Sequence, residues 1–157
     1  MKLASFKKEF LESITPLYNN DEARSLYYML CEEYLALSKS KLIIAEDIDL
    51  SVEKTNHLYN CLERLKKNEP IQYVLGNTKF CGLNFFVNES VLIPRPETEE
   101  LVNIILKNEL GDKTILDIGS GSGCIAISLA KYYPNAKVTA LDVSKDAIDL
   151  SKMNAKE

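Results

Sequence analysis

The 157-residue sequence has a single histidine, no C-x-x-C pair and no unbroken run of 18 apolar residues. His57 lies among polar residues of an expected helix, which is more typical of a solvated side chain than of a catalytic base. No spacing of cysteines and histidines is typical of a metal site. Residues 1–9 lack the apolar core of a signal peptide. We therefore expect a cytoplasmic protein without a metal and without a membrane partner.

An excess of positive charge is also missing. The net charge is −4, and the parts on either side of Pro70 each carry −2. Neither part has the basic field expected of a duplex-binding surface, so no direct contact with nucleic acid is predicted. The 46% hydrophobic and 27% charged shares are those of a globular protein, of one ordinary domain or two small ones. The four widely spaced cysteines are expected to be reduced, buried thiols.

The first 68 residues read as a helical bundle. Apolar residues recur at helical spacing from Leu3 to Ile14, and a second helix is expected to begin at a cap formed by Asn20 or Asp21. Ser51 is the expected cap of a further helix. The inner face of that helix is predicted to carry Val52, Thr55, Tyr59, Leu62 and Leu65.

The pattern changes after Asn68. Residues 71–76 look like a short extended stretch that ends at Gly76. Residues 80–87 are rich in aromatics, and Gly82 is a bulge or turn signal among them. Residues 69–90 are therefore predicted to form a hairpin-like connector.

Three of the six glycines lie within five residues, at the end of the segment T-I-L-D-I-G-S-G-S-G, residues 114–123. An apolar run stops at the glycines, and residues 124–133 then have the length and composition of a helix. A strand, a glycine turn and a helix in this order expose bare backbone and a helix N-terminus to a ligand. A flexible linker is the alternative, but a linker is not expected between a buried strand and an apolar helix.

A second buried strand is expected over residues 137–142, and Ser144 is the expected cap of a final helix. Residues 114–157 would then form a β-α-β-α run with parallel strands. Asp142 ends the second strand, 19 residues after Gly123. An acid at this place accepts hydrogen bonds from the ribose of a nucleoside cofactor. The alternative is an ordinary turn aspartate.

The glycine spacing narrows the choice of cofactor. A dinucleotide fingerprint needs glycine or alanine where this sequence has Cys124, and no Gly-Lys-Ser/Thr of a phosphate loop follows. The spacing G-x-G-x-G instead suits a compact amino-acid tail, as in S-adenosylmethionine. Asp117 would help to place the ammonium or sulfonium end of that cofactor.

Arg95 lies between two prolines, Pro94 and Pro96. The first proline keeps Ile93 extended, Pro96 suits a first helical turn, and Glu97 is favoured there by the helix dipole. These helix-start signals do not explain why an arginine is held rigidly between two prolines. Arg95 has either a role in a site or a structural ion pair.

Three segments together resemble the HemK/PrmC family of peptide-chain-release-factor glutamine methyltransferases. They are E-P-I-Q-Y-V-L-G at residues 69–76, V-L-I-P-R-P-E-T-E at residues 91–99 and L-D-I-G-S-G-S-G at residues 116–123. The second segment is the specific one, since many methyltransferases share the glycine loop. The resemblance implies an α/β fold: a helical bundle over residues 1–68, the connector over 69–90, and the start of a Rossmann-like class I methyltransferase domain over 91–157.

The resemblance also implies the site. S-adenosylmethionine would be held by the loop and the strand-end acid, and residues 94–97 would border the cofactor and acceptor pocket. The cofactor-binding residues are then Gly119, Ser120, Gly121, Ser122, Gly123 and Asp142, and the pocket-lining candidates are Asp117, Pro94, Arg95, Pro96 and Glu97. The family methylates the side-chain amide of the glutamine in the Gly-Gly-Gln loop of release factors, and its bundle helps to engage that partner.

The sequence departs from the family in one respect. The family grips the acceptor amide with an Asn-Pro-Pro-Tyr motif, and this sequence has no Pro-Pro pair. No catalytic residue is therefore assigned, and we expect an N-terminal fragment that is inactive alone. Two other functions stay open: an adenine-amine methyltransferase acting on DNA or RNA, and a non-catalytic protein-binding fragment.

Overall fold

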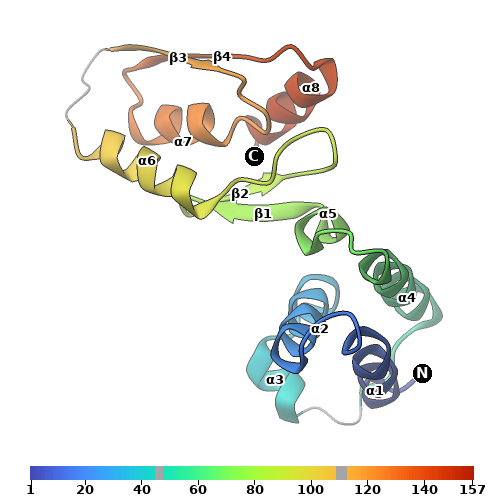
Figure 1. Ribbon diagram of the computed structural model, residues 1–157. Helices are drawn as coiled ribbons and strands as arrows, with labels where there is room; N and C mark the ends of the chain where they lie inside the picture. The colour runs from blue at the N-terminus through green and yellow to red at the C-terminus, as the bar shows by residue number, and fades with distance from the viewer. Residues whose placement is uncertain (45–47, 109–112) are drawn as a thin grey trace. The chain divides into compact units, whose positions relative to one another are not determined.

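The computed structural model describes residues 1–44, 48–108 and 113–157 (Figure 1). The chain forms two compact units, Met1–Leu75 and Gly76–Glu157. Within the described residues the first unit is helical apart from one bridge between Lys2 and Asp49, and the second holds an antiparallel and a parallel pair of strands. The predicted α/β class is confirmed. No helix in these ranges is long and apolar enough to cross a membrane.

The first unit packs its helices around a shared apolar core. Its elements are α1 (Leu3–Ile14), α2 (Asn20–Leu35), α3 (Lys39–Ile44), α4 (Val52–Lys66) and α5 (Ile71–Leu75). Aromatic rings of α1 and α2 meet at its centre: Phe10 lies 5.8 Å from both Phe6 and Tyr27, measured between ring centroids. All three side chains are buried. The helical spacing of apolar residues in α1 predicted this core.

Two details of the helix starts differ from expectation. The cap of α2 is Asn19, whose Oδ1 accepts a hydrogen bond from Glu22 N at 2.9 Å, so the prediction of Asn20 or Asp21 is wrong. Ser51 does cap α4, accepting from Lys54 N at 3.2 Å. Val52, predicted to face the core, is 77% exposed. The first turn of α4 extends past the core, and the first buried residue of this helix is Leu58, six residues after Val52.

The prediction that residues 71–76 are extended is wrong, because residues 71–75 form the helix α5. Pro70 directly precedes this helix, and its carbonyl accepts from Tyr73 N at 3.0 Å and from Val74 N at 3.1 Å. At the other end, the Arg64 guanidinium donates to Tyr73 O at 2.9 Å and to Val74 O at 3.2 Å. A five-residue helix is unstable by itself. These bonds from α4 are what favour it over the extended form.

The second unit begins with the hairpin β1 (Asn77–Phe80) and β2 (Leu83–Phe86). Its two-residue turn has φ of 47° at Cys81 and 73° at Gly82, a pair of left-handed residues that matches the twist of antiparallel strands. The turn predicted at Gly82 is confirmed. So are the buried, free thiols of all four cysteines.

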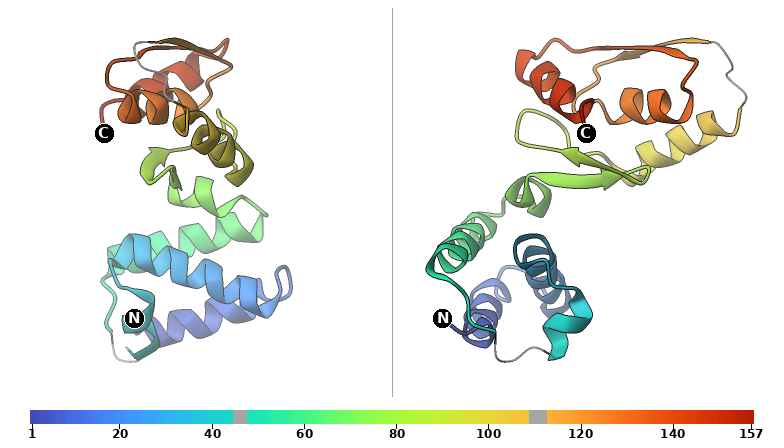
Figure 2. Two further views of the ribbon diagram at one scale, coloured as in Figure 1. Left: turned by 90° about the vertical axis from the view of Figure 1, so that its left-hand side faces the viewer. Right: turned by 180° about the vertical axis from the view of Figure 1, so that it is seen from behind.

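The parallel sheet consists of β3 (Thr114–Ile118) and β4 (Lys137–Leu141), in register from Thr114 opposite Lys137 to Ile118 opposite Leu141. The helices α7 (Cys124–Tyr132) and α8 (Lys145–Asn154) follow the two strands and cover one face of the sheet (Figures 1 and 2). The helix α6 (Pro96–Leu106) packs against α7. The predicted β-α-β-α run with parallel strands is confirmed, and both strands end at the same edge.

Candidate functional site

The glycine loop, residues 119–123, joins the end of β3 to the start of α7. Its three glycines have φ of 77°, 54° and 80°, the left-handed conformation that favours glycine. The first two amides of the loop, Gly119 N and Ser120 N, donate to Leu141 O at 2.8 and 3.0 Å. The loop therefore folds over the end of β4, where the second predicted site element begins.

The space around the glycines differs along the loop. A Cβ atom at Gly119 or Gly121 would meet nothing within 4 Å, whereas one at Gly123 would lie 2.9 Å from Ile127 Cδ1 and closer still to Ser151 Oγ. Gly119 and Gly121 thus present bare backbone to an open surface, while Gly123 allows α7 and α8 to approach each other. Only the first two leave room for a ligand.

Asp142 is joined directly to the glycine loop. Its Oδ2 accepts from Gly121 N at 2.8 Å, and its Oδ1 accepts from Ser144 N at 2.9 Å. These two backbone donors, Ser144 first, hold the pKa of the Asp142 carboxyl below its usual range. The structure therefore brings together the loop and the acid that the spacing predicted, with the acid as a fixed anion.

Three polar atoms near the loop have no hydrogen-bond partner among the described residues although they are buried: Asp117 Oδ2, Ser120 Oγ and Ser122 Oγ. Burial raises the pKa of Asp117, and the negative charge of Asp142 raises it further, against a backbone hydrogen bond from Ala126. Buried polar groups without partners are rare in folded proteins. Their grouping makes the loop and the end of β3 a candidate ligand site.

We expect an Asp117→Asn variant to be more stable than the parent protein at pH 7. Because the folded-state pKa of Asp117 is raised, the stability that its proton supplies is complete below the unfolded value, about 3.9, and is lost as pH rises through the folded value. The variant loses this dependence. Asp142 acts in the opposite sense: its contribution is lost as pH falls through its depressed pKa. Urea unfolding between about pH 4 and pH 8 measures the effect of Asp117, and unfolding below about pH 4 measures the effect of Asp142. An unchanged pH profile would contradict the assignment, and exposed Asp146→Asn is the control.

Residues 94–97 lie at the start of α6. Arg95 is the residue before the helix, with extended backbone, and Pro96 is its first residue, as predicted. Arg95 and Glu97 are exposed. In the ranges 1–44, 48–108 and 113–157, Arg95 has no salt bridge, and no hydrogen bond links residues 94–97 to the glycine loop. The described residues thus contain no structural ion pair of Arg95. That residues 94–97 border the cofactor and acceptor pocket stays a prediction.

One residue that reaches the loop was not predicted from the sequence. Asn154, at the end of α8, donates from Nδ2 to Ser122 O at 2.8 Å. An asparagine in the last turn of an amphipathic helix carries no signal for such a contact, because the contact depends on how α8 packs against the loop.

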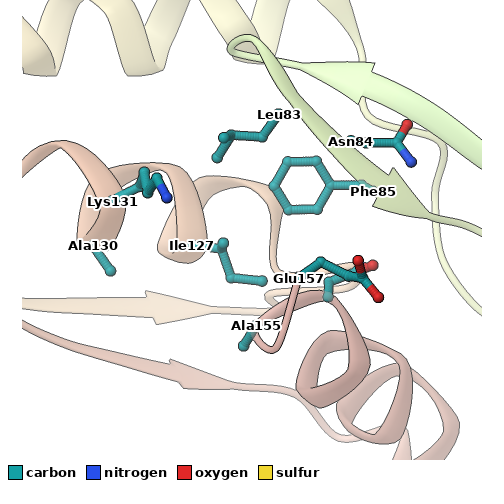
Figure 3. Close-up of a pocket in the computed structure, with 9 residues that line it drawn as sticks. Leu83, Asn84, Phe85, Ile127, Ala130, Lys131, Ala155 and Glu157 are labelled. Atoms are coloured by element: carbon teal, nitrogen blue, oxygen red, sulfur yellow. The ribbon is translucent and has the colours of Figure 1, made fainter.

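A cavity of about 440 Å³ lies elsewhere in the second unit, between β2, α7 and the C-terminal residues (Figure 3). Apolar side chains such as Leu83, Phe85 and Ile127 line it, with Lys131 and Glu157 among them, but no residue of the glycine loop does. We assign the site to the strand ends, because ligands of open α/β sheets bind outside the carboxyl ends of the strands. The part of the chain that the structure describes holds no cluster of metal-ligating side chains. His57 is exposed, as predicted, and lies in the first unit.

The two units match different family descriptions. Residues 10–76 match the PrmC N-terminal domain, and residues 96–157 match the Methyltransferase small domain. The chain is 42% identical to a release factor glutamine methyltransferase of Flavobacterium psychrophilum, covering 99% of the chain and 56% of that protein. It is 45% identical to the protein of the same name in Bacteroides thetaiotaomicron, covering 93% and 52%. The chain spans about half the length of the curated relatives it matches.

Proposed function

The chain belongs to the HemK/PrmC family of methyltransferases, and from this premise we propose that its glycine loop and Asp142 hold S-adenosylmethionine. We further propose that the methyl group goes to the side-chain amide nitrogen of the glutamine in the Gly-Gly-Gln loop of peptide chain release factors. Release factor glutamine is what the names of the relatives specify. The first unit, which matches the PrmC N-terminal domain, would engage that protein substrate.

The bond between Asp142 and Gly121 carries the cofactor proposal. It places an ionised carboxylate beside two glycines with open space above them. Each carboxylate oxygen has a further lone pair, so Asp142 can accept from ribose hydroxyls without releasing the loop. The partnerless atoms of Asp117, Ser120 and Ser122 supply polar groups for the amino-acid end. The residues present therefore fit this cofactor.

S-adenosylmethionine, when bound, supplies an electrophilic methyl group. The acceptor amide nitrogen is a poor nucleophile because its lone pair is delocalised, so the reaction depends on orientation and on hydrogen bonds to the acceptor. The residues of this chain position the methyl donor: the strand ends set its place, and the Asp142 carboxylate accepts from its ribose hydroxyls. The 157 residues contain no Pro-Pro pair, and we assign no acceptor-binding residue among them.

Calorimetry with S-adenosylhomocysteine tests the cofactor proposal. We expect Asp142→Asn to weaken binding at least about tenfold, because a charge-assisted acceptor is lost and an amide N–H is turned toward a backbone donor. Asp146→Asn, an exposed carboxylate of the first turn of α8, is the matched control and should bind as the parent does. A folded parent protein that binds no S-adenosylhomocysteine would refute the proposal.

The acceptor is tested separately. The 157 residues span about half the length of the relatives and are expected to be inactive alone, so the reaction is run with the full-length gene product. It is incubated with S-adenosylmethionine and a peptide chain release factor, and the Gly-Gly-Gln peptide is examined by mass spectrometry for one added methyl group. A parallel reaction with DNA or RNA tests adenine methylation. Methylated nucleic acid with an unmodified release factor would overturn the proposed acceptor.

A further inference from the structure

The side chain of Asn154 is only 4% exposed and makes three hydrogen bonds. Its Oδ1 accepts from Phe86 N at 2.7 Å, and its Nδ2 donates to Phe86 O at 3.1 Å and to Ser122 O at 2.8 Å. Both amide protons and the carbonyl oxygen are therefore used. The group is buried and fully satisfied, which makes it sensitive to any change of donor or acceptor.

Two of these bonds close the edge of the hairpin. Phe86 directs both its N–H and its C=O to Asn154, while the neighbouring Val87 N donates to Gly76 O at 2.9 Å. The amide of Asn154 thus takes the place that one residue of an adjacent strand would occupy. These two bonds to Phe86 fix the orientation of the carboxamide, whose Nδ2 also contacts the loop.

The third bond holds the glycine loop from the side of α8. Ser122 lies between two residues with positive φ, Gly121 and Gly123. Asp142 fixes the N–H of Gly121, and Asn154 fixes the carbonyl of Ser122, so adjacent residues are held by different elements. A loop with three left-handed glycines has many conformations available when it is free. Two anchors on consecutive residues select one of them.

We infer that Asn154 is a positioning residue for cofactor binding, and that it couples the edge of the hairpin to the glycine loop. The inference rests on the proposed function of that loop. Asparagine alone meets the requirement at this length. Aspartate has no donor for the two carbonyls, and alanine makes no bond.

The test compares Asn154→Asp with Asn103→Asp, the same chemical change at an exposed position of α6. S-adenosylhomocysteine affinity is measured by calorimetry at a temperature where circular dichroism shows each protein folded. We expect Asn154→Asp to bind about tenfold more weakly and to recover affinity as pH falls and the new carboxyl gains a proton, while Asn103→Asp is unchanged. A lower melting temperature with unchanged affinity would show a structural role only and would overturn the inference.

A second measurement needs no variant. In the parent protein, the Nδ2 protons of Asn154 should exchange slowly with water in nuclear magnetic resonance spectra, and S-adenosylhomocysteine should shift them. Binding by the parent without any shift at Asn154 would overturn the inference and leave the cofactor proposal intact. Absence of binding by the folded parent would refute the cofactor proposal, and the inference with it.

Discussion

Replacing Gly123 with alanine is expected to lower the free energy of unfolding by about 3 kcal/mol. An alanine in the left-handed conformation costs about 1–2 kcal/mol, and forcing a methyl group into a packed interior costs about 1–3 kcal/mol. Gly123 has φ of 80°, and its Cβ would lie 2.9 Å from Ile127 Cδ1 and nearer to Ser151 Oγ. Urea unfolding followed by circular dichroism gives the difference.

Gly121→Ala is the matched control for this prediction. It carries the same left-handed cost, but its Cβ meets nothing within 4 Å, so the loss should be only about 1–2 kcal/mol. The two variants should also differ in binding. The methyl group at Gly121 points into the open space proposed for the cofactor and should weaken S-adenosylhomocysteine binding without unfolding the protein. Equal destabilisation by both changes would contradict the packing assigned to Gly123.

A Phe10→Ala change is expected to destabilise the first unit by about 3–5 kcal/mol. The ring is fully buried and lies within 5.8 Å of the rings of Phe6 and Tyr27, so its removal leaves a cavity that rigid aromatic neighbours cannot fill. Amide hydrogen exchange in α2 and α4 measures the loss locally.

Leu17→Ala provides the comparison for this core variant. Leu17 is 51% exposed, and its truncation should change stability by less than about 0.5 kcal/mol. If Phe10→Ala had as small an effect, the aromatic centre of the bundle would not be the main source of its stability.

The features that could be predicted from the sequence are those set by neighbours in the chain. Ser51 and Ser144 cap the helices that follow them. Each hydroxyl accepts a hydrogen bond from the backbone N–H three residues later in the chain, and this spacing is visible in the sequence. Adjacent parallel strands place the glycine loop and Asp142 at one edge of the sheet, so their meeting follows from the order of elements.

The missed features depend on contacts between distant residues. The Arg64 guanidinium stabilises α5 by donating to the carbonyls of Tyr73 and Val74, and the sequence of residues 71–75 alone does not predict these bonds. The cap of α2 lies one residue earlier than the nearer of the two predicted positions. Asn19, Asn20 and Asp21 are all residue types that favour this position, so the residue types alone do not select one of them. Asn154 reaches Ser122 across 32 positions of sequence, which is why it escaped prediction.

The outer face of the parallel sheet has a practical consequence for solubility. Leu116, Ile118 and Leu141 point away from α7 and α8 and are exposed, and Ile118 lies opposite Leu141 in the register. Neighbouring exposed apolar side chains on a sheet face favour association with other molecules. Sulfate and phosphate strengthen such association, because they are excluded from protein surfaces. Dilute protein in a weakly salting-out buffer is therefore the right sample for the calorimetry, since self-association would otherwise add its own heat.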